Sequence, residues 1–293
     1  MSRHSRRAFE QALRRAAPVV FGVEVSAERD LPSLPWAALR YHDLERVKVS
    51  LAEAGYAAGT INLTLAGLRG VLRHCRKLRL LSPDDFEDLR EVRRVRGSGA
   101  VAGRALSSEE VASLFAAAEG LAHPIRERDL ALLALAFSTG ARRSEISALD
   151  LVDYQAARPS IRIRSGKGGR DRVAFMTLAA AIHVETWLEV RGSGGGALLQ
   201  PIRSNGRILA RRLSAGSAYG RFQRLSSLAG IGRLTPHDAR RTVATSMLAA
   251  GVDVVTTARQ TGHSSLEVLR ASYDRRGEES VRQAVASSIA IPA

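Results

Sequence analysis

The chain has 293 residues, of which 45% are hydrophobic and 25% charged, a composition typical of a globular protein with one large domain or two ordinary ones. Its formal net charge of +15 indicates a polyanionic partner, most simply nucleic acid. No stretch approaches the roughly 20 apolar residues of a membrane-spanning helix. The single cysteine, Cys75, excludes an intrachain disulfide, and no Cys/His spacing indicates zinc. We expect a cytoplasmic protein that binds no metal.

The N-terminal part predicts a basic arm followed by a helical domain. Residues 1–30 combine basic residues and Glu10 with a short apolar run, which is typical of an amphipathic arm rather than a signal peptide. Within residues 31–96, Ser82 followed by Pro83 is a typical helix start. Apolar residues also recur at helical spacing in this segment, as in the stripe Ile61, Leu65, Leu68 and Leu72. We therefore expect a small all-helical domain over 31–96.

The stretch VRRVRGSGAVAGRA is rich in glycine and arginine and shows no periodicity, which predicts a linker over residues 97–104. Two interpretations of the basic residues in and beside this segment are equally supported. They are either solvated, or they form a basic strap along a phosphate backbone. The residues are Arg93, Arg94, Arg96 and Arg104.

Residues 105–293 predict a larger domain that is mostly helical. Ser107 and Glu110 in LSSEEVASLFAAAEG form a capping box, and RERDLALLALAFSTG is apolar nearly all round, as expected for a central helix. In SIRIRSGKGGRDRVAFM, apolar residues occupy alternate positions on both sides of a glycine-rich turn, which predicts a β-hairpin. The expected fold class is therefore mainly α with a small β-sheet (α+β).

The segment TPHDARRTVATSML predicts a helix with a strongly basic first turn. Thr235 is a suitable N-cap, Pro236 occupies the first helical position and Asp238 can complete the cap. His237 and Arg240 lie three residues apart and share a face. Cationic groups at the positive end of a helix dipole are unfavourable alone but favourable around an anion, which predicts an anion site. The alternative is a solvated basic helix start.

Three further segments hold candidate groups. In STGARRSEISAL, Arg142 follows a Thr-Gly break and Glu145 lies one turn on, which by itself is an ordinary surface pair. Lys167 at the hairpin tip is one of only three lysines among 44 basic residues, and lysine can donate a proton where arginine cannot. SGKGG lacks P-loop spacing, which excludes that kind of nucleotide site. QTGHSSLEVLRASYD contains His263 after a glycine and Tyr273 ten residues later.

In this order, the segments resemble those of the tyrosine recombinase (phage integrase) family over most of the chain. The resemblance implies that 31–96 is a core-binding domain and 105–293 a catalytic domain. Two departures are visible. Arg241 stands where a histidine or lysine is usual, and the interval from His263 to Tyr273 is one residue longer than in the family. The implied catalytic residues are Arg142, Lys167, His237, Arg240, His263 and Tyr273, with Glu145 and Arg241 in supporting positions. Expected DNA contacts are Arg93, Arg94, Arg96, Arg104, Arg143 and Arg170.

The resemblance further implies a site-specific recombinase of a mobile element that integrates, excises or resolves double-stranded DNA through a 3′-phosphotyrosyl intermediate. It implies a homotetramer on two DNA sites, weakly associated or monomeric without DNA, nucleoid-associated and without a cofactor. Two alternatives remain open. One is a catalytically reduced DNA-binding protein of the same fold, supported by the longer His263–Tyr273 spacing. The other is a type IB topoisomerase, which shares the phosphotyrosyl chemistry. A basic protein of the membrane surface would explain the charge but none of the motifs.

Overall fold

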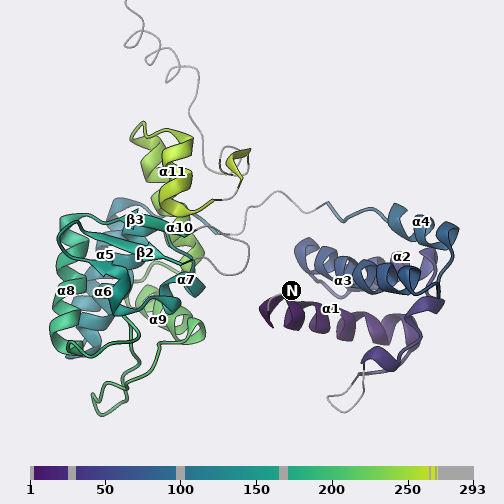
Figure 1. Ribbon diagram of the computed structural model, residues 1–293, viewed down its shortest axis with the longest axis horizontal. Helices are drawn as coiled ribbons and strands as arrows, with labels where there is room; N and C mark the ends of the chain where they lie inside the picture. Colours follow the sequence, from purple (N-terminus) through teal and green to yellow (C-terminus); the bar gives the residue numbers. More distant parts are fainter. Residues whose placement is uncertain are drawn as a thin grey trace, which may run out of the picture. The chain divides into compact units, whose positions relative to one another are not determined.

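The computed structural model divides the chain into two compact units, Met1–Ala100 and Val101–Ala293, each with a hydrophobic core of its own (Figure 1). The predicted fold class is confirmed, because helices dominate and the described residues contain one three-stranded sheet. Among the described helices, none is long and apolar enough to cross a membrane. The structure describes residues 3–25, 31–96, 103–164, 171–263, 265–267 and 269.

The first unit is built from helices, as the sequence predicts for 31–96. The apolar stripe of the third helix is at most 1% exposed and forms the centre of the core. Ser82 accepts a hydrogen bond from the backbone amide of Asp85 at 3.1 Å, so the predicted N-cap is confirmed. The elements are α1 (Arg3–Phe21), the 3-10 turns η1 (Leu31–Ser33) and η2 (Trp36–Ala38), α2 (Tyr41–Glu53), α3 (Ala58–Lys77) and α4 (Pro83–Glu91).

The N-terminal segment differs from the separate arm expected over residues 1–30. Helix α1 packs against α2 and α3 as part of the first unit. Its apolar face is made of small residues, with Ala12, Ala16 and Ala17 completely buried. A Cβ on Gly67 of α3 would lie only 3.2 Å from the Ala12 Cβ, so the two helices approach closely at this point. The amphipathic pattern of this segment therefore serves the core of its own domain.

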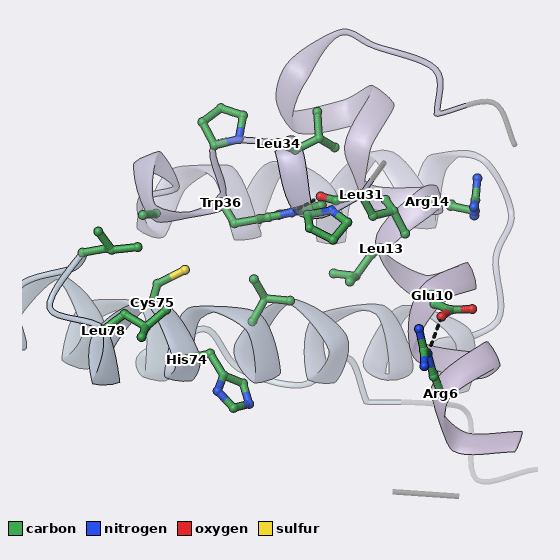
Figure 2. A pocket seen from close by; sticks show the side chains of 15 residues that line it. Arg6, Glu10, Leu13, Arg14, Leu31, Leu34, Trp36, His74, Cys75 and Leu78 are labelled. Atoms are coloured by element: carbon green, nitrogen blue, oxygen red, sulfur yellow. Dashed lines mark hydrogen bonds and ion pairs between the residues drawn. The ribbon is translucent and has the colours of Figure 1, made fainter. Parts of the chain in front are cut away.

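An apolar groove of about 850 Å³ lies between α1, the two 3-10 turns and the C-terminal part of α3 (Figure 2). Trp36 forms one wall, fixed by a 2.8 Å hydrogen bond from its indole nitrogen to the Leu31 carbonyl oxygen. At the edge of the groove, Arg6 and Glu10 pair with each other at 2.9 Å. The residues that line this groove are mostly aliphatic. The arginine and histidine residues that the family resemblance implies to be catalytic lie in the second unit.

The second unit is organised around a central helix, α6, in agreement with its apolar sequence. Eleven of its residues are buried, and it packs against α5, α8 and α10. Ser107 and Glu110 form the predicted capping box at the start of α5. The helices are α5 (Ser108–Glu119), α6 (Ile125–Thr139), α7 (Arg143–Ala148), α8 (Leu178–Arg191), α9 (Ala215–Leu228), α10 (Pro236–Ala249) and α11 (Val254–Thr261), with the 3-10 turn η3 (Leu151–Asp153).

The sheet of the second unit is antiparallel in the order β1 (Tyr154–Gln155), β2 (Ser160–Ile163), β3 (Arg172–Phe175). Pairing of β2 with β3 confirms the predicted hairpin, whose tip, 165–170, lies outside the described residues. Ile163 lies opposite Arg172, so this arginine occupies the tip-proximal end of β3. Helix α11 packs against both β3 and α10, and these three elements frame the site described next (Figure 1).

Candidate active site

The basic first turn of α10 is held by a buried carboxylate, Asp238, which is 3% exposed. Thr235 and Asp238 form the predicted capping box: the Asp238 carboxylate accepts from the Thr235 backbone amide at 2.7 Å, and the Thr235 hydroxyl accepts from the Asp238 amide at 3.3 Å. The same carboxylate accepts from the backbone amide of Arg104 at 2.9 Å. The helix start is thus fixed in place with His237 and Arg240 in its first two turns.

Arg240 is a buried guanidinium, only 1% exposed, that joins distant segments. It donates to the Gly140 carbonyl oxygen, 100 residues away in sequence, at 2.9 Å, and to the Thr261 carbonyl oxygen at the end of α11. Gly140 has a left-handed φ of 60°, and a Cβ there would lie 2.9 Å from the Thr261 side chain. The glycine of the sequence STGARR is therefore needed for this close approach.

Arg142 lies at the other side of the same glycine turn and reaches the same end of α11. Its guanidinium donates to Glu145 at 2.8 Å and to the Gly262 carbonyl oxygen at 3.1 Å. Glu145 also accepts from the Arg142 backbone amide at 2.8 Å. Because the Arg142 side chain is 47% exposed, it can still bind an anion from solvent. The Arg142–Glu145 pair is therefore more than a local surface contact.

His263 follows α11 directly, and its ring orientation is set by Thr261. The Thr261 hydroxyl lies 2.6 Å from the Thr257 carbonyl oxygen and 2.7 Å from His263 Nδ1. Since the hydroxyl proton goes to the carbonyl, the hydroxyl oxygen accepts from His263, which places the ring proton on Nδ1. Burial, reinforced by the positive charge of Arg240, lowers the pKa of His263 to about 3.

His237 lies close to the same cations. Burial lowers its pKa, and the charges of Arg240 and Arg142 act in the same direction. Two neutral imidazoles and two guanidinium groups are thus brought together from α10 and from the segments that follow α6 and α11. Such a cluster of positive charge is suited to an anion, because backbone and side-chain donors converge where a negative group would be stabilised. Among the described residues, no group of three or more His, Cys, Asp or Glu side chains could hold a metal ion.

Two residues of this site were missed by sequence reasoning, Arg172 and Gln260. Arg172 pairs with Glu145 at 2.8 Å. The Gln260 side-chain amide bonds both backbone groups of Phe175, at 3.0 and 2.7 Å, and the Ser138 carbonyl oxygen at 3.0 Å. It therefore ties α11 to β3 and α6. Their partners are mostly backbone groups, which leave no pattern in the sequence.

Several predicted residues lie elsewhere. Lys167, Arg170 and Tyr273 lie outside the described residues. Arg241 is 7% exposed and donates to the Gly103 carbonyl oxygen at 2.6 Å, so it fastens the end of the expected linker to α10. The predicted supporting role of Arg241 at the phosphate stays a prediction.

The expected DNA contacts are partly engaged within their own units. Arg104 pairs with Glu110 at 2.5 Å, and Arg143 stacks over Tyr219 with 5.5 Å between the guanidinium carbon and the ring centre. In the first unit, Arg93, Arg94 and Arg96 are exposed. Arg93 and Arg94 line a shallow cavity together with Arg69, Arg73 and Arg90, so a basic surface continues from α3 and α4 into this segment.

Gly262 is expected to tolerate no side chain. Its φ is 76°, and a Cβ there would collide with the Arg172 guanidinium. Gly262→Ala should therefore destabilise the second unit by about 1–3 kcal/mol, measured by urea unfolding. Gly194→Ala is the control, because its Cβ would meet nothing within 4 Å. Equal stability of Gly262→Ala and the parent protein would contradict the described packing of Arg172 on this turn.

Comparison with known proteins agrees with this geometry. The model of the Phage integrase family matches residues 104–279. The chain is 29% identical over 248 residues to tyrosine recombinase XerC of Alcanivorax borkumensis, covering 83% of this chain and 77% of that one. It is 32% identical over 218 residues to tyrosine recombinase XerC of Corynebacterium efficiens, covering 73% and 67%.

Among solved structures, a lambda integrase dimer bound to a core site shares the fold. Its TM-score is 0.70 at 15% sequence identity, with 95% of this chain and 91% of that chain covered. The family match spans more than half of the chain and includes the arginine and histidine segments that meet at the end of α11. The chain belongs to the phage integrase family of tyrosine recombinases.

Proposed function

We propose that this protein is a site-specific DNA recombinase that cuts and rejoins double-stranded DNA through a phosphotyrosyl intermediate. The observation that carries the proposal is the convergence of Arg142, Arg240, His237 and His263 on one point near the end of α11. The two arginines would bind the non-bridging oxygens of one phosphodiester, to which their planar guanidinium groups are matched. The names of the relatives, tyrosine recombinase XerC, support the same chemistry.

In the cleavage step, the Tyr273 oxygen would attack the phosphorus, forming a 3′-phosphotyrosyl bond and breaking the bond to the 5′ oxygen. The tyrosine proton would pass to His237, which is neutral because of its lowered pKa and can accept it. Lys167 would supply the proton that the departing 5′ oxygen takes up. The arginines would stabilise the charge on the phosphorane-like transition state, and His263 would join them as a donor once the charge of the bound phosphate allows its Nε2 to take up a proton.

Rejoining would reverse these steps with a 5′-hydroxyl from another strand as the nucleophile. Since the phosphotyrosyl bond conserves the bond energy, no cofactor is required. Exchange between two duplexes needs four strand cuts, which is the reason for proposing a homotetramer on two DNA sites. A type IB topoisomerase would instead relax supercoils as a monomer without site preference, and this difference separates the two proposals.

Binding should depend mainly on phosphate contacts. Arg93, Arg94 and Arg96 of the first unit and Arg143 of the second are candidates, because all four are exposed. We expect the logarithm of the affinity to fall linearly with the logarithm of salt concentration, with a slope of about −0.9 for each phosphate contact.

The decisive experiment is a search for the covalent adduct. A library of nicked duplexes with randomised sequence is incubated with the protein, and duplexes that stay attached in hot detergent are recovered and sequenced. We expect one recovered sequence family with the parent protein and none with Tyr273→Phe. Adducts that persist in Tyr273→Phe would contradict the assigned nucleophile. Binding without any adduct would favour the catalytically reduced alternative, and adducts without sequence preference would favour the topoisomerase.

The linker provides a separate prediction. Its composition predicts that trypsin cleaves after Arg96, at the start of 97–104, in the free protein and that bound DNA protects this bond. Mass spectrometry of the fragments, with and without the selected duplex, measures the protection. Equal cleavage in both states would contradict a basic strap on the DNA.

A further inference from the structure

Arg172, at the start of β3, makes an unusual set of contacts for a hairpin residue. Its side chain is 14% exposed, and its guanidinium binds both oxygens of Glu145, at 2.8 and 3.2 Å. It also donates to two consecutive carbonyl oxygens at the end of α11, that of Gln260 at 3.4 Å and that of Thr261 at 3.1 Å. One guanidinium thus joins three elements, β3, α7 and α11.

Two of these partners, Glu145 and the Thr261 carbonyl oxygen, also hold the two proposed phosphate-binding arginines. Glu145 binds the side chain and the backbone amide of Arg142. The Thr261 carbonyl oxygen accepts from Arg240 as well as from Arg172. Arg172 therefore shares Glu145 with Arg142 and the Thr261 carbonyl oxygen with Arg240.

We propose that Arg172 is a positioning residue that sets the geometry of Arg142, Arg240 and the His263 turn, an inference that rests on the proposed recombinase function. Its donors on Nε, Nη1 and Nη2 are all engaged by protein oxygens, so it acts through its partners and does not contact DNA. The carbonyl end of α11 also carries the negative end of the helix dipole, which favours a cation there.

The surrounding structure is adapted to this arginine. Gly262, whose missing Cβ leaves the space that the Arg172 guanidinium fills, is followed directly by His263. A lysine could keep the charge but not the fork that spans two carboxylate oxygens and two carbonyls. Arg172 also places a second positive charge against Glu145, beside that of Arg142, which keeps that carboxylate ionised and available to Arg142.

The experiment compares Arg172→Gln and Arg172→Lys with a matched control, Arg191→Gln. Arg191 is also a partly buried arginine of the second unit that donates to backbone carbonyls, those of Ala197 at 2.9 Å and Gly192 at 2.8 Å, but it lies away from the site. Single-turnover adduct formation is measured on the duplex recovered with the parent protein. We expect Arg172→Gln to slow cleavage by about 10²-fold, as a displacement of about 1 Å can do, and Arg172→Lys to fall between it and the parent.

Two further readouts separate positioning from other roles. The salt dependence of binding, measured in the Tyr273→Phe background, should keep its slope in Arg172→Gln, whereas loss of a phosphate contact would reduce the slope by about 0.9. Hydrogen exchange of the free protein should rise in the peptide 254–263 in Arg172→Gln and not in Arg191→Gln.

The outcomes are distinct. Parent-like cleavage by Arg172→Gln, a slowing no larger than that of Arg191→Gln, or a reduced salt slope would overturn the positioning role. If the parent protein forms no adduct with any duplex, the proposed function fails. Hydrogen exchange still decides whether Arg172 holds the end of α11, because unchanged exchange in Arg172→Gln would overturn this inference by itself.

Discussion

Arg142→Gln is expected to slow strand cleavage by about 10²–10³-fold while leaving the fold intact, because it removes one positioned donor to the charge that develops on the phosphate. The side chain is 47% exposed, and its pair with Glu145 is open to solvent on that side. Loss of such a pair costs at most about 1 kcal/mol of unfolding free energy. The measurement is single-turnover adduct formation, with urea unfolding of the same preparation.

Arg158→Gln is a suitable control for Arg142→Gln, because Arg158 is an exposed arginine on the turn between β1 and β2. It changes the net charge equally and should keep the parent cleavage rate. Arg240 gives the contrasting case: at 1% exposure, its replacement removes buried hydrogen bonds and should both slow cleavage and lower stability. A tenfold or smaller effect of Arg142→Gln would place the phosphate elsewhere.

Local features were the ones that could be predicted from the sequence. The helix starts at Ser82, Ser107 and Thr235 follow rules that involve only three or four neighbouring residues, and the structure confirms all three. The hairpin of β2 and β3 is likewise visible, because alternation around a glycine-rich turn is a short-range pattern.

The partner against which an apolar helix face packs could not be predicted from the neighbouring sequence. The first helix reads as an amphipathic arm, and only the small residues that meet at Ala12 and Gly67 show that it packs inside the first unit. The roles of Arg172 and Gln260 were hidden for a related reason. Their backbone partners are carbonyl and amide groups 85 to 122 positions away, which nearly every residue type carries.

The meeting of the motifs could be anticipated only from the resemblance to a family. Spacing alone indicates that His237 and Arg240 share a helix face, but nothing in it joins them to Arg142 or His263. The structure makes this connection through the carbonyl oxygens at the end of α11. Lys167 and Tyr273 stay predictions, and the covalent adduct is their direct test.

The second unit is expected to lose stability in two stages as the pH falls, first through His263 and then through Glu145. The pKa of His263 is lowered from 6.5 to about 3 by burial and the neighbouring Arg240, so the unfolded chain takes up this proton first. Its contribution is therefore complete above pH 6.5 and declines progressively toward pH 3. His237 acts in the same direction, because its pKa is also lowered.

Glu145 acts in the lower range. Burial raises the pKa of its carboxyl, but hydrogen bonds from Arg172 and Arg142 outweigh burial and hold the pKa at about 2, against an ordinary 4.5. The contribution of Glu145 is complete above pH 4.5 and is lost as the pH falls toward 2, a loss on the order of 3 kcal/mol. Of His237, His263 and Glu145, only the two histidines therefore change the stability of the second unit between pH 6.5 and 4.5.

Tryptophan fluorescence can follow the second unit separately. The chain has two tryptophans, and Trp187 is completely buried in α8. In a Trp36→Phe background, urea unfolding of Trp187 should give a lower stability at pH 5 than at pH 7, and His263→Gln should remove part of that difference. Equal stability at both pH values would mean that His263 takes up its proton as readily in the folded protein as in the unfolded chain. That result cannot be reconciled with a histidine half-buried beside Arg240 and Arg142, since those charges oppose its protonation until an anion such as a DNA phosphate offsets them.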